Sequence, residues 1–292
     1  MEHRNVLRES LGKFYQIFAE KTFRVGVKGE VKVGFDERMK SYLMEMIDEN
    51  QKGKLLTIKE CEGGDYHRKI PHLSNASAME YFDYYLYIVG DDAPFYYILD
   101  EGGEVIAQKP IEQTPHPHPY RMPSDKKADL ECGVRIEVGD KQYFLALGSG
   151  SQSPQRDKGY VIPLNNPEDT EVIKELNLKP LYDNLRHHNN IKNLSLEAGI
   201  TYKDSEDKSR IVLFNRGGQF QKNAIIFFSN PGGLHEKIKE AIKNRRDLDT
   251  EDVLPEAFDF DLPLIHGIAP GITGAAYCKT ADILLYKPLF FC

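Results

Sequence analysis

The chain alternates short apolar runs with polar, glycine-rich turns, and this pattern recurs along much of its length. The clearest copy runs from Asp129 to Leu164, a second copy starts at Leu194, and an earlier one starts at Ser74. Each copy contains a glutamate, two apolar runs, a polar turn and a third apolar run. Runs rich in β-branched and aromatic residues between turn formers predict β-strands rather than helices. These runs are Tyr85–Val89, Tyr143–Leu147 and Arg210–Phe214, followed after the turns by Phe95–Leu99 and Ala224–Phe228.

Repeated small sheets of this kind predict an all-β fold, and specifically a β-propeller. A three- or four-stranded sheet cannot bury both of its faces alone, whereas radial stacking of several sheets buries them. The glutamates are 51 and then 66 residues apart, at positions 80, 131 and 197, against about 40–50 residues in regular propeller repeats. The longer spacing implies an insertion at Asn165–Asn193. We expect about five or six blades, incomplete at the C-terminal end of this chain.

The N-terminal segment does not share the repeat. Asn5–Lys21 and Asp36–Asn50 have apolar residues at helical spacing, and Thr22–Phe35 alternates as a hairpin does. We therefore predict a small α/β extension, helix–hairpin–helix, at residues 1–52. The propeller domain is then residues 53–292.

Four further segments can be interpreted from their sequence. Leu234–Arg246 has the periodicity of a helix, and Asp169–Asn189 suggests one or two short helical turns. Ala257–Pro270 has no regular pattern. Four prolines in Thr114–Pro123 predict a surface loop, because proline disrupts both helix and central strand. A fourth repeat begins at Gly271 and supplies two strands.

Composition and charge exclude some functional classes. The net charge of −7 and pI of about 5.8 argue against a nucleic-acid partner, which usually requires a basic face. No apolar run approaches the length of a membrane span. The four cysteines form no C-x-x-C pair, which favours free thiols in a reducing compartment. The N-terminus lacks the pattern of a secretory signal, so a cytoplasmic location is expected. The oligomeric state is not predicted.

Several phrases occur in an order that resembles a family of bacterial β-propeller-like proteins grouped as a domain of unknown function. They include V-G-D-D-A-P, D-L-E, L-G-S-G-S followed by R-D, and N-R-G. Ala78 stands where the family has glycine, and Gly274 stands where it usually has an acid. The resemblance implies an architecture similar to phytase-like and gluconolactonase-like propellers, and it implies no reaction. The matching stretches are Ser74–Pro94, Ala128–Tyr160, Asn193–Phe228 and Gly271–Tyr277.

The repeated glutamates Glu80, Glu131 and Glu197 are the candidates for a metal site. At the start of an innermost blade strand a side chain can point towards the propeller axis. Carboxylates that converge there repel one another unless a cation or an arginine lies between them. Ca²⁺ suits such a site because it takes six to eight oxygen ligands, and the resemblance to gluconolactonase-like propellers supports it. Alternatively, each glutamate accepts backbone hydrogen bonds or pairs with an arginine.

The polar turns supply the candidate ligand-binding residues. Their backbone N–H groups and nearby cations can hold an anion. The alternative is an ordinary blade turn in which Arg156 pairs with Asp129 or Glu131. The candidates are Asp91, Asp92, Ser149, Ser151, Arg156, Asn215, Arg216 and Asn223.

These features together favour a binding protein. We expect the axial face of the propeller to hold a small polar ligand or a metal ion. One alternative is a metal-dependent hydrolase of a lactone or a phosphoester, in which the cation polarises the substrate or activates water. Another is a protein-interaction scaffold that uses the Thr114–Pro123 loop. No catalytic residue can be assigned from the sequence.

Overall fold

The computed structural model describes residues 21–25, 29–33, 76–111, 122–165, 167, 173–188, 191–217, 221–229, 233–261, 271–278 and 283–289. The chain divides into two compact units, Met1–Thr57 with Cys278–Leu284 and Ile58–Tyr277 with Leu285–Cys292. In the first unit, β1 (Lys21–Val25) and β2 (Gly29–Val33) pair antiparallel. The hairpin predicted for this segment is therefore confirmed.

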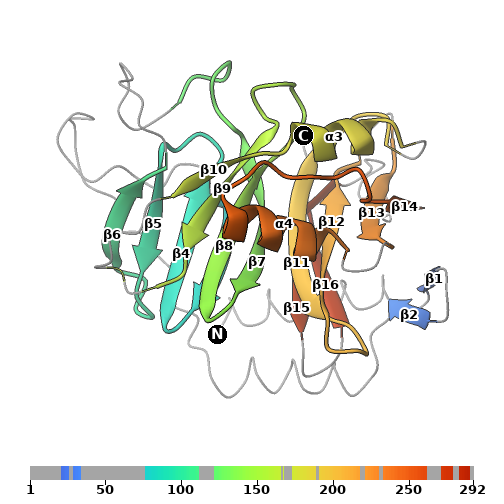
Figure 1. Cartoon of the computed structure of the whole chain (residues 1–292), viewed down its shortest axis with the longest axis horizontal. Helices are drawn as coiled ribbons and strands as arrows, with labels where there is room; N and C mark the ends of the chain where they lie inside the picture. Colours follow the sequence, from blue (N-terminus) through green and yellow to red (C-terminus); the bar gives the residue numbers. More distant parts are fainter. Residues whose placement is uncertain are drawn as a thin grey trace, which may run out of the picture. The chain divides into compact units, whose positions relative to one another are not determined.

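Three four-stranded antiparallel sheets dominate the second unit (Figure 1). In each sheet the strands lie in chain order, and each strand pairs antiparallel with the next. The first sheet consists of β3 (Ala76–Phe82), β4 (Tyr85–Gly90), β5 (Phe95–Leu99) and β6 (Val105–Pro110). The second consists of β7 (Leu130–Val138), β8 (Lys141–Gly148), β9 (Lys158–Pro163) and β10 (Lys174–Asn177). The third consists of β11 (Leu196–Lys203), β12 (Ser209–Asn215), β13 (Asn223–Phe228) and β14 (Pro255–Phe260). A further pair consists of β15 (Gly271–Cys278) and β16 (Ile283–Leu289).

The mostly β architecture confirms the all-β class that the apolar runs predict. All five of those runs lie in strands. β7 illustrates the cause, because its alternating residues Cys132, Val134 and Ile136 are buried in one core while their neighbours are more exposed. This period of two places one apolar face of the strand against a neighbouring sheet.

Neighbouring sheets pack through their faces, with the first strands β3, β7 and β11 adjacent in that order. A close backbone approach makes this possible at Gly199 of β11, where a Cβ atom would lie 2.7 Å from the Cys132 sulfur. The core between the first two sheets includes Tyr87, Val89, Tyr96, Ile98, Phe144, Ala146, Tyr160 and Ile162. The core between the second and third sheets includes Val134, Ile136, Leu145, Leu147, Leu196, Ile211, Leu213 and Ile226.

Two helices complete this second core. α3 (Lys179–Arg186) buries Leu181, Tyr182 and Leu185, and lies in the predicted insertion. α4 (Gly233–Asn244) packs on β7 and β12, and it confirms the helix predicted there within two residues at each end.

The last strand of the second and third sheets was not predicted. β10 forms where the sequence suggested a helical turn, and β14 includes residues that had no regular pattern. Both strands are short, and each is stabilised by pairing with the strand before it. Pairing partners distant in sequence can override local preference in this way.

Some predictions lie outside the described residues. These are the helices at residues 5–21 and 36–50, the domain boundary at residue 52 and most of the proline-rich loop. Within the part of the chain that is described, no helix has the length and apolarity needed to cross a membrane.

Candidate functional site

The first strand of each four-stranded sheet contains a β-bulge near its start. The pairing register shifts between Ala76 and Ala78 in β3, and the same shift occurs at the corresponding places in β7 and β11. A bulge leaves one residue out of the ladder and redirects its side chain. The three bulged residues are Ser77, Glu131 and Glu197.

Glu131 thus has two acidic neighbours brought to it by different turns. Asp91 directly follows β4, and Asp129 directly precedes β7 with a left-handed backbone (φ 57°). Ligand oxygens of Asp91, Asp129 and Glu131 all lie within 4.8 Å of one another. We call these three residues the acidic cluster.

Asp129 is the member of the acidic cluster whose carboxylate is already paired with basic side chains and a hydroxyl. The Lys127 ammonium lies 2.6 Å from Asp129 Oδ1 and 2.7 Å from Asp91 Oδ2. Arg156 donates to Asp129 Oδ2 at 2.6 Å, and so does the Ser149 hydroxyl. Both oxygens of Asp129 are therefore occupied, which confirms the alternative in which Arg156 pairs with Asp129.

The other two members are less well satisfied. Asp91 Oδ1 is buried and has no hydrogen-bond partner among the described residues. Within the described residues, no hydrogen-bond donor contacts the half-buried Glu131 carboxylate. A buried carboxylate without donors is unfavourable in its charged form. These oxygens are the acceptors of the cluster that the described part of the chain leaves without a donor.

The electrostatics follow from this arrangement. Burial raises the pKa of Glu131 to about 8, and the carboxylate of Glu197 is the next largest cause. Burial also raises the pKa of Glu197 to about 7, although the charge of Arg216 opposes the shift. The charge of Glu197 on β11 therefore contributes to the raised pKa of Glu131 on the neighbouring strand β7.

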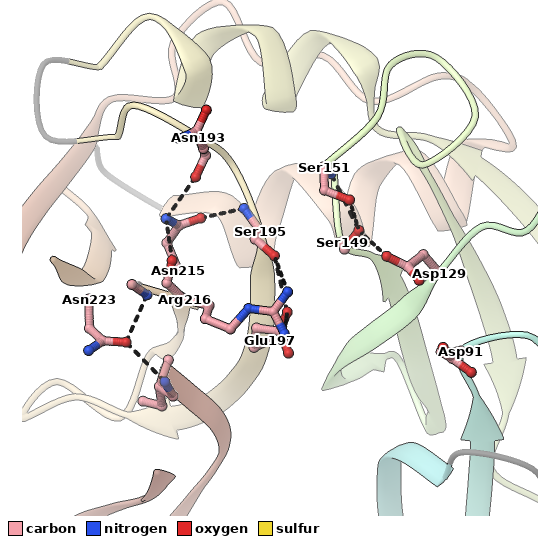
Figure 2. A network of polar contacts seen from close by, with 12 residues as sticks. Asp91, Asp129, Ser149, Ser151, Asn193, Ser195, Glu197, Asn215, Arg216 and Asn223 are labelled. Carbon is pink, nitrogen blue, oxygen red and sulfur yellow. Dashed lines mark hydrogen bonds and ion pairs between the residues drawn. The ribbon is translucent and has the colours of Figure 1, made fainter. Parts of the chain in front are cut away.

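Glu197 is better satisfied than Glu131. It lies 2.9 Å from Arg216 and accepts a hydrogen bond from the Ser195 hydroxyl at 3.1 Å (Figure 2). Arg216 also donates to Ser195 Oγ at 3.2 Å. The pairing with an arginine considered for the glutamates is thus present here.

Glu80 is not brought to the same position. It stands three residues beyond the bulged Ser77 of β3 and forms an ion pair with Arg135 of β7. Burial raises the pKa of Glu80, and the Arg135 charge opposes this shift. The Ser77 hydroxyl, at the bulge itself, donates to the Leu130 carbonyl. The structural equivalent of Glu131 and Glu197 in the first repeat is therefore Ser77. An alignment of the three repeats on their glutamates shifts the first repeat by three residues relative to the other two.

The other candidate ligand-binding residues of the polar turns have different structural roles. Ser151 accepts from Arg156 at 2.6 Å, beside the acidic cluster. The side chains of Asn215 and Asn223 accept hydrogen bonds from backbone N–H groups (Figure 2). Asn215 Oδ1 accepts from Ser195 N at 2.7 Å. Asn223 Oδ1 accepts from Gly217 N at 2.8 Å and from Ile272 N at 2.9 Å. Asp92 is buried, and its backbone oxygen accepts from Met122 N at 2.7 Å.

Sequence reasoning missed Lys127, Ser77 and Ser195. Asp129 was considered only as a partner of Arg156. The signal for Asp129 was its place directly before Leu130-Glu131, in the D-L-E phrase. Ser77 gave no comparable signal, because its partner, the Leu130 carbonyl, lies in another sheet. Lys127 gave none either, because its partner Asp91 is distant in sequence.

Comparison with protein families shows to which family the chain belongs. The model of a family of unknown function, DUF6929, matches residues 72–287. The chain belongs to this family. No curated protein and no solved structure matches it. The membership of DUF6929 agrees with the resemblance to a domain of unknown function, and it assigns no activity.

The matched region of this DUF6929 protein contains every residue of the acidic cluster together with Glu197 and Arg216. Carboxylate oxygens are hard ligands that suit Ca²⁺ and Mg²⁺. Lys127, Arg156 and Arg216 offset part of the negative charge. The arrangement can therefore take a proton or a cation at Glu131.

Proposed function

We propose that this protein is a binding protein whose acidic cluster takes a divalent cation, with Ca²⁺ as the first candidate. The observation that carries the proposal is the position of the Glu131 carboxylate. It lies close to Asp91 and Asp129, is influenced by Glu197, and has no hydrogen-bond donor within the described residues. A bound cation offsets the repulsion between the neighbouring carboxylates and gives the Glu131 carboxylate a positively charged partner.

The donor set supports Ca²⁺ over softer metals. The open acceptors are the Glu131 carboxylate and Asp91 Oδ1, and all of them are oxygens. The one cysteine nearby in sequence, Cys132, is buried, and burial raises the pKa of its thiol well above the usual range. A protonated thiol is a poor ligand for zinc. Ca²⁺ also accepts water molecules and irregular geometry, which suits a site with few protein ligands.

We further propose that the sheets are blades of a β-propeller. The support is the chain-order strand sequence of each sheet and the adjacency of the first strands β3, β7 and β11. In a propeller the first strands surround the axis, so the bulged residues Ser77, Glu131 and Glu197 would face it. Glu131 of the acidic cluster and Glu197 would then face the axis, a position that the sequence predicted for Glu80, Glu131 and Glu197.

Other expectations stay predictions. They include the similarity to phytase-like and gluconolactonase-like propellers, a bacterial origin, a cytoplasmic location and the absence of a nucleic-acid partner. A small polar ligand with an ammonium group has the same charge requirement as a cation. Metal-dependent hydrolysis and a scaffold role have no specific support among the described residues.

Isothermal titration calorimetry at about pH 9, above the pKa of Glu131, tests the proposal. The expected result is saturable binding of one Ca²⁺ per chain, lost in Glu131→Gln and kept in Glu80→Gln, whose carboxylate already has Arg135 as a partner. Ca²⁺ at about 100 times its Kd should also stabilise the fold by about 2.7 kcal/mol. Titrations with Mg²⁺ and with methylammonium distinguish a metal site from an ammonium site. Wild-type protein that neither binds Ca²⁺ nor gains stability from it would overturn the proposal.

A further inference from the structure

The insertion helix α3 holds the polar loop beside the acidic cluster. The loop, residues 149–157, follows β8 and carries Ser149, Ser151 and Arg156. From α3, the Tyr182 hydroxyl donates to Gly148 O at 2.6 Å, and Arg186 Nη2 donates to Gly150 O at 2.6 Å. Tyr182 is fully buried. These two side chains therefore fix the start of the loop.

The same guanidinium also fixes the end of the loop. Arg186 Nη1 donates to Asp157 Oδ2 at 3.0 Å, and Nη2 donates to Asp157 Oδ1. The Asp157 side chain is only 1% exposed and also accepts from Ser153 Oγ at 2.5 Å. A bidentate arginine–carboxylate ion pair is both strong and directional. A single residue, Arg186, thus joins the two ends of the loop.

The backbone conformation of the loop is restricted at Gly150. Gly150 has a left-handed φ of +69°, and a Cβ there would lie 2.6 Å from Leu194 and 2.9 Å from Tyr182. Its N–H donates to Arg156 O at 3.1 Å, within the loop. The path of the backbone therefore determines where Arg156 meets the cluster.

We infer that Arg186, assisted by Tyr182, is a positioning residue for the cation site. It touches no member of the acidic cluster. It holds the loop so that Ser149 and Arg156 orient Asp129 from one side. Partners that orient metal ligands from outside typically contribute 10- to 100-fold in metal affinity. This inference rests on the proposed function.

The variants are chosen to keep the protein folded. Arg186→Met alone would leave the buried Asp157 charge unpaired, which is strongly destabilising. The double variant Asp157→Asn with Arg186→Met removes both charges together. The matched control is Arg246→Met, which removes an arginine from an exposed pair with Glu240. Tyr182→Phe removes one hydroxyl and serves if the double variant does not fold.

Two measurements on each variant test the inference. Calorimetric titration should show a Kd for Ca²⁺ at least about tenfold weaker in the double variant, several-fold weaker in Tyr182→Phe, and unchanged in Arg246→Met. Amide hydrogen exchange should be faster within residues 149–157 of the first two variants and unchanged in strands β7 and β8. A role in global stability alone would not produce this local pattern in protein kept well below its melting temperature.

The possible failures can be told apart. If the wild type binds no Ca²⁺, the proposed function fails, while the exchange data still report whether Arg186 orders the loop. If the wild type binds Ca²⁺ and the folded double variant binds it equally well, the positioning role is overturned. Where only Tyr182→Phe folds, an unchanged Kd overturns it as well.

Discussion

Glu131 and Glu197 occupy the same bulge position on two neighbouring strands, β7 and β11, and the charge of Glu197 helps to raise the pKa of Glu131. They differ in what surrounds them. Arg216 and Ser195 contact Glu197, whereas no donor within the described residues contacts Glu131. This difference leaves Glu131 as the glutamate of the pair that can take up a cation.

The stability of the protein should fall as the pH rises towards 8. Folding raises the pKa of Glu131 from 4.5 to about 8. Between these values the folded state keeps a proton that the unfolded chain has released, so the free energy of unfolding decreases as pH increases. We expect a loss on the order of a few kcal/mol across this window, measured by urea unfolding without divalent cations. Glu131→Gln should reduce the slope to the part that Glu197 contributes, because burial also raises the pKa of Glu197 to about 7. An equally steep loss in that variant would contradict the assignment.

The affinity for Ca²⁺ should change with pH in the opposite direction. The cation must displace the proton on Glu131, so binding strengthens as the pH rises through about 8. Proton release can be measured by titrating in buffers of different ionisation enthalpy. Glu80→Gln is the matched control and should keep the wild-type dependence, because Glu80 pairs with Arg135 away from the bulge. Binding that is independent of pH would exclude Glu131 as a ligand.

Gly199→Ala should destabilise the fold by about 2 kcal/mol, because added volume in a packed core forces its surroundings to move. The new Cβ would lie 2.7 Å from both Cys132 Sγ and Val134 Cγ1 on the neighbouring sheet. Gly102→Ala is the control, since its nearest contact is the Asp100 side chain at 3.1 Å. Thermal or urea unfolding measures both. Equal stabilities of the two variants would argue against close packing of β7 and β11.

Asn223→Ala should cost about 2 kcal/mol, because its side-chain oxygen accepts two backbone hydrogen bonds that would be lost together. The donors are Gly217 N at 2.8 Å and Ile272 N at 2.9 Å. Asn223→Asp keeps the acceptor and should lose less. Urea unfolding gives the comparison, and faster amide exchange at Ile272 should accompany the loss in the alanine variant. A neutral Asn223→Ala would mean that this side chain does not tie β13 to β15.

Local pattern was sufficient to predict most of the strands. The runs around Tyr85, Tyr143 and Arg210 combine β-branched and aromatic residues with turn formers on both sides, and each is a strand. The preference of such residues for a half-buried pleated surface acts over a few positions, so it can be recognised in the sequence. The helix α4 was recognisable for the same reason, from its apolar period.

The tertiary structure decided the outer strands and the membership of the site. β10 and β14 form by pairing with β9 and β13, and this pairing overrides weak local preferences. The sequence alone identified Glu131 and Glu197 but aligned Glu80 with them, because a bulge is a feature of register between strands and leaves no mark in residue type. Asp91 follows β4, whereas Lys127 and Asp129 lie in the segment before β7, and only the packing of the first sheet beside the second brings Asp91 to the other two.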